Sequence, residues 1–96
     1  MIPDLSPAEL ERLALLMEEM GESIQAIGKI MRHGYESRHP DGGPTNRELL
    51  EKEIGHVNVA VRMMVDSEDL WQTRIQGHEF KKVGSVGQYL HHQGGK

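Results

Sequence analysis

The sequence predicts an all-α fold, a small antiparallel helical bundle completed by oligomerisation, in a single domain over residues 1–96. Apolar residues recur at steps of three and four in two long segments, and helix start signals precede both segments. No alternating run of apolar and polar residues occurs, so no sheet is expected. A chain of 96 residues buries only about 60–70 % of its unfolded surface, so a lone monomer would be marginally stable. We therefore expect a homo-oligomer.

The first helix is expected over about residues 6–33. Ser6 can cap it, Pro7 fits the first helical position, and Glu9 completes a capping box. Gly34 supplies the C-terminal stop. Apolar residues form one stripe that we expect to pack the core: Leu13, Leu16, Met17, Met20, Ile24, Ile27 and Met31. Polar residues lie on the opposite side, with Glu19 on one flank: Glu11, Glu18, Glu22, Gln25 and Lys29.

The second helix is expected over about residues 45–66, after a loop at Tyr35–Pro44 that is rich in Gly and Pro and reads as flexible. Thr45 or Asn46 would cap this helix, with Glu48 in its first turn. Its apolar stripe also has helical spacing: Leu50, Ile54, Val57, Val61, Met64 and Val65.

A third helix is expected over about residues 68–82. The acidic run Asp66–Asp69 can cap it, and its apolar residues begin with Leu70 and Trp71. Several glycines follow, which predicts a flexible C-terminal tail.

The composition excludes several classes of function. A net charge of −4 argues against binding of a nucleic-acid polymer, which needs a basic face. The chain has no cysteine, so disulfides and thiolate metal sites are ruled out, and a reducing cytoplasm fits. The N-terminus lacks the regions of a signal peptide, and no apolar run approaches the roughly 20 residues that span a membrane. We expect a cytoplasmic protein without a membrane partner.

Two acidic clusters, one in each long helix, carry the chemistry. Glu19 and Glu22 are three residues apart, so both carboxylates lie on one face of the first helix. Glu53 and His56 repeat this spacing in the second helix, and antiparallel packing would bring the four side chains together. Glu18 could bind a second ion. Hard cations such as Mg²⁺ or Mn²⁺ prefer carboxylate ligands and bind substrate phosphates in their remaining positions.

These motifs resemble those of the MazG-like all-α nucleoside triphosphate pyrophosphatases. Leu16–Glu22 matches the EExxE signature of that family in full, and Leu50–His56 matches ExxD except that His56 stands in place of the aspartate. The resemblance spans roughly residues 9–66, or two-thirds of the chain. Because imidazole is a softer, neutral donor, this departure would weaken one metal site, favour manganese, or leave His56 outside the ligand set.

The resemblance implies hydrolysis of a nucleoside triphosphate to the monophosphate and pyrophosphate. It also implies tight oligomers, commonly tetramers built as dimers of dimers. Small members occur in bacteriophages, and one branch, MazZ, acts on dGTP or GTP. The best expectation for the substrate is therefore (d)GTP, hydrolysed in the host cytoplasm if the protein is phage-encoded.

Carried over residue by residue, the resemblance makes Glu19, Glu22 and Glu53 metal ligands and His56 the fourth. It makes Glu18 a further ligand or a base that orients water. Lys29 and Arg32 become candidates for phosphate contacts. The remaining candidates are Arg38 and His39, which would close over the triphosphate, and Gln25, Asn58 and Trp71, which would hold the base or sugar.

Other interpretations remain open. A non-catalytic helical interaction module with an acidic, cation-binding face fits the same sequence. A related enzyme, such as phosphoribosyl-ATP pyrophosphatase or a dimeric dUTPase, is a third interpretation, although the chain is short for the dUTPase. Each candidate residue also has a purely structural interpretation: Lys29 and Arg32 would balance the acids on their own helix, and Trp71 would anchor a core or a subunit interface.

Overall fold

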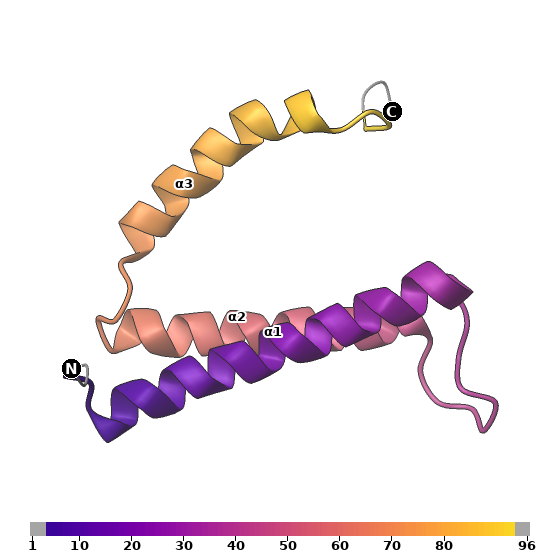
Figure 1. Cartoon of the computed structure of the whole chain (residues 1–96), viewed down its shortest axis with the longest axis horizontal. Coiled ribbons are helices and arrows are strands. Elements are labelled where there is room, and N and C mark those ends of the chain that lie inside the picture. The colour runs from indigo at the N-terminus through magenta and orange to yellow at the C-terminus, as the bar shows by residue number, and fades with distance from the viewer. Residues whose placement is uncertain (1–3, 94–96) are drawn as a thin grey trace.

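Residues 4–93 are described in the computed structural model, and they form an all-α chain. The elements are α1 (Pro7–His33), α2 (Asn46–Asp66), α3 (Gln72–Ser85) and the short 3₁₀ helix η1 (Val86–Tyr89). Helices α1 and α2 lie side by side and antiparallel as a hairpin, and α3 leaves the hairpin near the start of α1 (Figure 1). The described residues contain no strand, only an isolated bridge between Arg38 and Thr45. The all-α prediction is confirmed.

The two long helices begin with the capping boxes that the sequence predicts. The Glu9 backbone N–H donates to Ser6 Oγ over 3.1 Å, and Glu9 Oε1 accepts from the Ser6 N–H over 2.7 Å. Thr45 and Glu48 repeat the arrangement at 3.1 and 2.7 Å, so Thr45 is the cap of α2. The hydrogen bond from the Thr45 backbone lowers the pKa of the Glu48 carboxyl. Gly34 ends α1 with φ 90°, as predicted.

The third helix begins later than the sequence predicts. The backbone N–H groups of residues 67–70 donate to carbonyls of the last turn of α2, so the acidic run ends α2 instead of starting α3. Trp71 precedes α3 without a capping hydrogen bond from its side chain, and α3 continues to Ser85. Part of the predicted flexible tail is thus helical, and its last residues, 94–96, lie outside the described residues.

Helices α1 and α2 pack through small side chains. Ser23, Ala26 and Ala60 are 7 %, 6 % and 0 % exposed, and Met64 is the one large side chain among the buried apolar residues described. The expected core stripe of α1 faces away from α2, since most of its members are exposed: Leu13, Met17, Met20, Ile24, Ile27 and Met31. The prediction that this stripe forms the core is therefore wrong for a single chain. Small side chains let the helix backbones approach closely, and the longer apolar side chains are left outside the contact.

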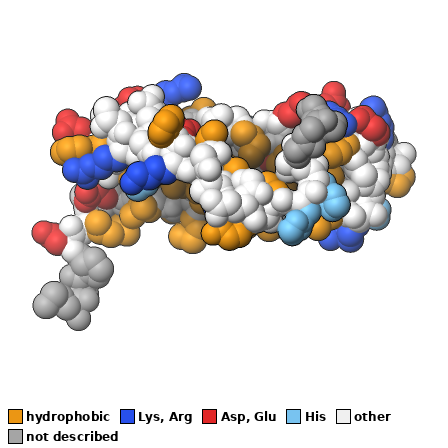
Figure 2. Space-filling view, turned by 90° about the horizontal axis from the view of Figure 1, so that it is seen from above, with side chains coloured by type: hydrophobic (Ala, Val, Ile, Leu, Met, Phe, Trp, Pro, Cys, Tyr) orange, Lys and Arg blue, Asp and Glu red, His pale blue; other side chains and the backbone are white. Residues whose placement is uncertain are grey.

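The isolated chain is open. Its radius of gyration is 17.0 Å, against about 13 Å for a compact domain of similar length. Helix α3 packs on neither long helix to any extent, and Phe80 and Val83 on it are about four-fifths exposed. Hydrophobic side chains, orange in Figure 2, gather at the surface along the lower edge of that view. Within residues 4–93, no helix has the length and apolar character needed to cross a bilayer.

One ion pair fastens the end of α2 to α1. Arg12 Nε and Nη2 donate to the two carboxylate oxygens of Asp69 over 2.5 and 3.0 Å, and both side chains are less than one-fifth exposed. Such a bidentate pair fixes geometry as well as adding energy. It also holds the turn from which α3 departs. The hydrogen bond from Arg12 lowers the pKa of Asp69.

Replacement of Asp69 by Asn is expected to lower the melting temperature at neutral pH, because Arg12 loses its charged partner. A lowered pKa in the folded state means that the ionised carboxylate stabilises the fold above the unfolded pKa of about 3.9. That contribution disappears as the pH falls through the folded pKa. The difference between wild type and D69N, followed by circular dichroism, should therefore shrink in acid. The exposed control D41N should change little at either pH, and a D69N difference independent of pH would contradict the assignment.

Candidate metal centre

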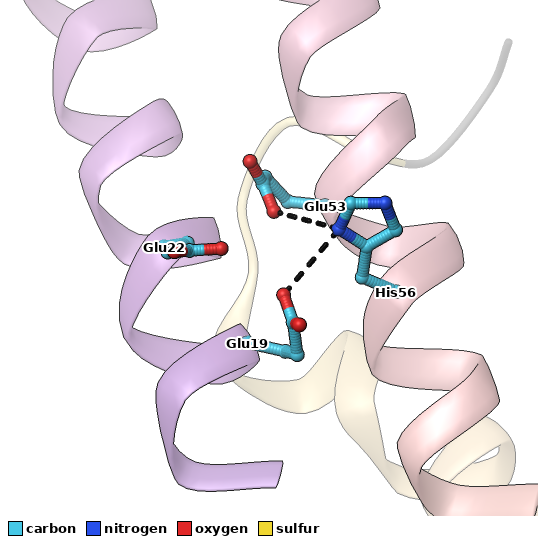
Figure 3. A group of neighbouring side chains, drawn as sticks. All are labelled: Glu19, Glu22, Glu53 and His56. Atoms are coloured by element: carbon cyan, nitrogen blue, oxygen red, sulfur yellow. Dashed lines mark ion pairs between the residues drawn. The ribbon is translucent and has the colours of Figure 1, made fainter. Parts of the chain in front are cut away.

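Four side chains from the two long helices meet midway along the hairpin. Glu19 and Glu22 come from α1, and Glu53 and His56 come from α2 (Figure 3). Each offers one ligand atom, and these atoms lie within 4.8 Å of one another. His56 Nδ1 is 3.4 Å from both Glu19 Oε1 and Glu53 Oε1. The structure thus brings together the four residues that the spacing of the acidic motifs singled out.

The helix contact explains why these side chains meet. Because each pair is three residues apart, both members project from the same side of their helix. Ser23 lies one turn after Glu19 in the buried contact, and its hydroxyl donates to the Glu19 carbonyl over 3.0 Å, so its polar group is satisfied. With Ala26 and Ala60 it keeps the helices close enough for carboxylates from both to share one volume.

Two carboxylate oxygens in this cluster have no hydrogen-bond partner, although each lies within ion-pair distance of His56. Glu19 Oε1 and Glu53 Oε1 are shielded from solvent and make no hydrogen bond, and the 3.4 Å separations from His56 Nδ1 are too long to supply one. A buried acceptor without a partner costs about 1–3 kcal/mol, and more when it is charged. Three carboxylates and one imidazole are donors that suit a divalent cation such as Mg²⁺ or Mn²⁺. The cluster therefore fits a metal that would bind the two unpartnered oxygens.

Three cavities lie along the same side of the hairpin as this cluster. The residues of α1 that line them recur at steps of three and four: Glu11, Leu15, Glu18, Glu22, Gln25, Lys29 and Arg32. This spacing places the cavities in a row along one helix face. We call the row the groove.

The central and basic cavities join the cluster to the loop. The central cavity, about 180 Å³, is lined by Glu22, Glu53, Gln25 and Lys29. Lys29 also lines the basic cavity, about 480 Å³, beside the loop between α1 and α2. Its other cationic or titratable side chains are Arg32, His33, Arg38 and His39. Of the residues expected to contact phosphate, Lys29 thus lies next to the cluster, and Arg32 lies further toward the loop.

Glu18 lies apart from the cluster. Its side chain is exposed and lines the third cavity, about 870 Å³, near the start of α1. Glu11 and Asp66 line this acidic cavity as well, together with the apolar side chains of Leu15 and Met63. Within one chain Glu18 lines the groove, but the structure does not place it among the candidate ligands.

Asn58 and Trp71 do not reach the cluster within one chain. Asn58 is exposed, and its position two residues after His56 turns it about 200° around α2. Trp71 is 54 % exposed at the start of α3, where the Arg74 guanidinium lies 4.1 Å from its ring centroid. Neither lines any of the three cavities.

Some features of the site escaped the sequence pattern. The carboxylates of Glu19 and Glu53 are mostly buried, at 15 % and 13 % side-chain exposure, although the apolar stripes predicted that other faces of the helices would be buried. The available signal was the small residues Ser23, Ala26 and Ala60, which mark the real helix contact. Nothing in the local sequence marks Arg12 and Asp69 as partners, because 57 positions separate them.

Mn²⁺ is expected to raise the melting temperature of the wild-type protein by several degrees, because it would bind the folded cluster. A ligand at 100 times its Kd adds about 2.7 kcal/mol to the free energy of unfolding. E53Q should melt higher than wild type without metal, since it removes a buried charge, and should lose most of the metal-induced rise. E51Q, a change at an exposed position of the same helix, is the matched control. Equal metal-induced rises in E53Q and E51Q would exclude the cluster as the binding site.

Comparison with protein-family models, curated proteins and solved structures finds no match to the chain. The likeness to MazG-like enzymes therefore rests on the two acidic motifs and their helical spacing.

Proposed function

We propose that the protein is a metal-dependent nucleotide pyrophosphatase of the MazG-like kind. It would hydrolyse a (deoxy)nucleoside triphosphate, with (d)GTP as the expected substrate, to the monophosphate and pyrophosphate. The single observation that carries this proposal is the pair of buried, unpartnered oxygens of Glu19 and Glu53, which face each other across the hairpin. The basic cavity, which shares Lys29 with the central cavity, supports phosphate as the substrate group.

The chain's own residues divide the work along the groove. Glu19, Glu22, Glu53 and His56 would hold Mg²⁺ or Mn²⁺, which neutralises phosphate charge and lowers the pKa of a bound water. Lys29 lies in the adjoining cavity and would contact phosphate. Glu18 is one turn before Glu22 and would orient the attacking water from the edge of the groove. Gln25 lines the central cavity and would donate to phosphate or sugar.

The assembly would be a homo-oligomer, for which we propose a tetramer built as a dimer of dimers. The argument is the exposed apolar surface: Met17, Ile24 and Met31 of α1 are 71 %, 69 % and 82 % exposed. Contiguous apolar surface of this kind is rare on soluble monomers and marks an interface. Asn58 and Trp71 would contact base or sugar only in a neighbouring subunit of such an assembly.

A second candidate is a non-catalytic helical module. His56 Nδ1 lies 3.4 Å from two carboxylates, so a protonated imidazole would offset part of their charge without any metal. In this case the acidic face that carries the cluster would serve to recruit a partner or a cation. Activity measurements separate the two candidates.

Incubation with a panel of triphosphates and Mg²⁺ or Mn²⁺ should release pyrophosphate in preference to free phosphate. The panel should contain dGTP, GTP, dUTP and phosphoribosyl-ATP, so that the related enzymes are separated. E19Q should lower the turnover by about 100-fold or more, since loss of an outer partner of a metal ligand alone costs about 10–100-fold. Full activity in E19Q, or phosphate as the sole product, would refute the proposal.

The control for that experiment is H56D, which restores the carboxylate found in the family motif. If His56 acts as a ligand, Mg²⁺-supported turnover should be kept or increased, because a carboxylate is the harder donor. A large loss of turnover with the fold unchanged would show that the imidazole has a role of its own.

The double variant M17E/I24E is expected to shift the protein to a smaller assembly, because charges would replace apolar side chains at the interface. Analytical ultracentrifugation measures this directly, and the wild type should sediment as a tetramer. K52E, at an exposed position of α2, is the charge-change control. A wild-type monomer at micromolar concentration would contradict the assembly.

A further inference from the structure

We propose that the groove binds its nucleotide in one direction only, with the terminal phosphates in the basic cavity and the nucleoside toward the acidic cavity. This inference rests on the proposed function, and it adds the orientation of the substrate and the location of the pyrophosphate product. The observation behind it is that the two ends of the groove carry opposite charge.

The basic cavity is suited to a polyphosphate. Lys29, Arg32 and Arg38 bring three positive charges to its lining, His33 and His39 add imidazoles, and the lining contains no carboxylate. Two acids of the loop flank this lining. Glu36 is paired with Arg47 at 2.7 Å, and Asp41, whose carboxylate is 92 % exposed, lies 3.5 Å from His39. The charge of Arg38 also contributes to the lowered pKa of Glu48, after the hydrogen bonds from Thr45. Guanidinium and ammonium groups are the usual partners of phosphate.

The wall of this cavity is held in place by the chain itself. Asn46 is 7 % exposed, and its amide donates to the Gly34 carbonyl over 3.1 Å while its backbone N–H donates to Ser37 over 2.8 Å. Arg38 donates to the Gly43 carbonyl over 2.9 Å. Gly42 and Gly43 have φ angles of 94° and 98°, which favour glycine. The loop that was expected to be flexible is therefore tied back at several points, and a preorganised cavity binds an anion at lower entropic cost.

The central cavity connects the cluster to the basic cavity through shared lining residues. Glu22 and Glu53 belong to both the cluster and the central cavity, and Lys29 belongs to both the central and the basic cavities. Lys29 follows Glu22 by two helical turns, or about 10 Å along the axis. A triphosphate held over the cluster can thus extend its β- and γ-phosphates toward Lys29 and Arg32.

The opposite end of the groove disfavours phosphate. Glu11, Glu18 and Asp66 bring three carboxylates to the acidic cavity, and its one guanidinium, Arg12, is already bound by Asp69. Leu15 and Met63 give this cavity an apolar wall. A base with N–H donors on its edge suits such a lining, because the flat ring would contact the apolar wall and the carboxylates would accept its hydrogen bonds.

Calorimetric titration of the metal-free protein with inorganic pyrophosphate, and separately with GMP, tests this orientation. R32A should weaken pyrophosphate binding by about tenfold, the effect of one lost charge-assisted hydrogen bond, and should change GMP binding less than twofold. E11Q, at a carboxylate of the acidic cavity, should weaken GMP binding by about tenfold and should change pyrophosphate binding less than twofold. R62A, which removes an exposed arginine that lines none of the three cavities, should leave both affinities unchanged.

Weaker GMP binding in R32A with pyrophosphate binding unchanged would reverse the orientation and overturn the inference, as would equal pyrophosphate binding in R32A and R62A. Arg32 is exposed and carries no hydrogen bond of the fold, so the variant should remain folded, which its circular dichroism would verify. Turnover is not needed for these titrations. If the wild type has no activity but R32A binds pyrophosphate more weakly, the enzymatic function is refuted and the anion site stands. If the wild type is active but R32A binds pyrophosphate as tightly as the wild type, the enzymatic function stands and the anion site is refuted.

Discussion

The carboxylates of Glu19 and Glu53 face each other between α1 and α2, and each has one buried oxygen that makes no hydrogen bond. Their mutual repulsion is the constraint on which the rest of the hairpin depends. Small residues must hold the helices close while the charges push them apart, and His56 Nδ1 lies 3.4 Å from an oxygen of each acid. A divalent cation would remove the conflict, because it would supply both oxygens with a partner.

The same constraint accounts for the open shape of the chain. The helix faces that carry Ser23, Ala26 and Ala60 form the contact between α1 and α2 around the acids. The apolar stripe of α1 is therefore left exposed. One hairpin cannot bury both of these surfaces. A second copy would supply the missing cover, and α3, which packs on neither long helix, would be free to join it. In this account, the contact between α1 and α2 through small side chains both forms the site and leaves the apolar surface that would drive assembly.

Local signals in the sequence predicted the local structure well. Ser6 with Glu9 and Thr45 with Glu48 form the capping boxes that set the ends of the long helices, and residue spacing alone grouped the four candidate ligands. Which face of each helix meets the other could not be read from hydropathy, because the apolar stripe of α1 is mostly exposed and the contact is made by small side chains. The start of α3 was missed because the backbone N–H groups of residues 67–70 donate to carbonyls of α2. The acidic run could either end α2 or cap α3, and the local sequence does not distinguish these two roles. Glu18 shares the motif but lies at the edge of another cavity.

Anomalous diffraction from crystals grown with Mn²⁺ tests the central claim most directly. The account predicts a peak between the two long helices, within bonding distance of carboxylate oxygens from both Glu19 and Glu53. A peak elsewhere on the chain, or no peak while the two oxygens remain buried and apart from any cation, would contradict it.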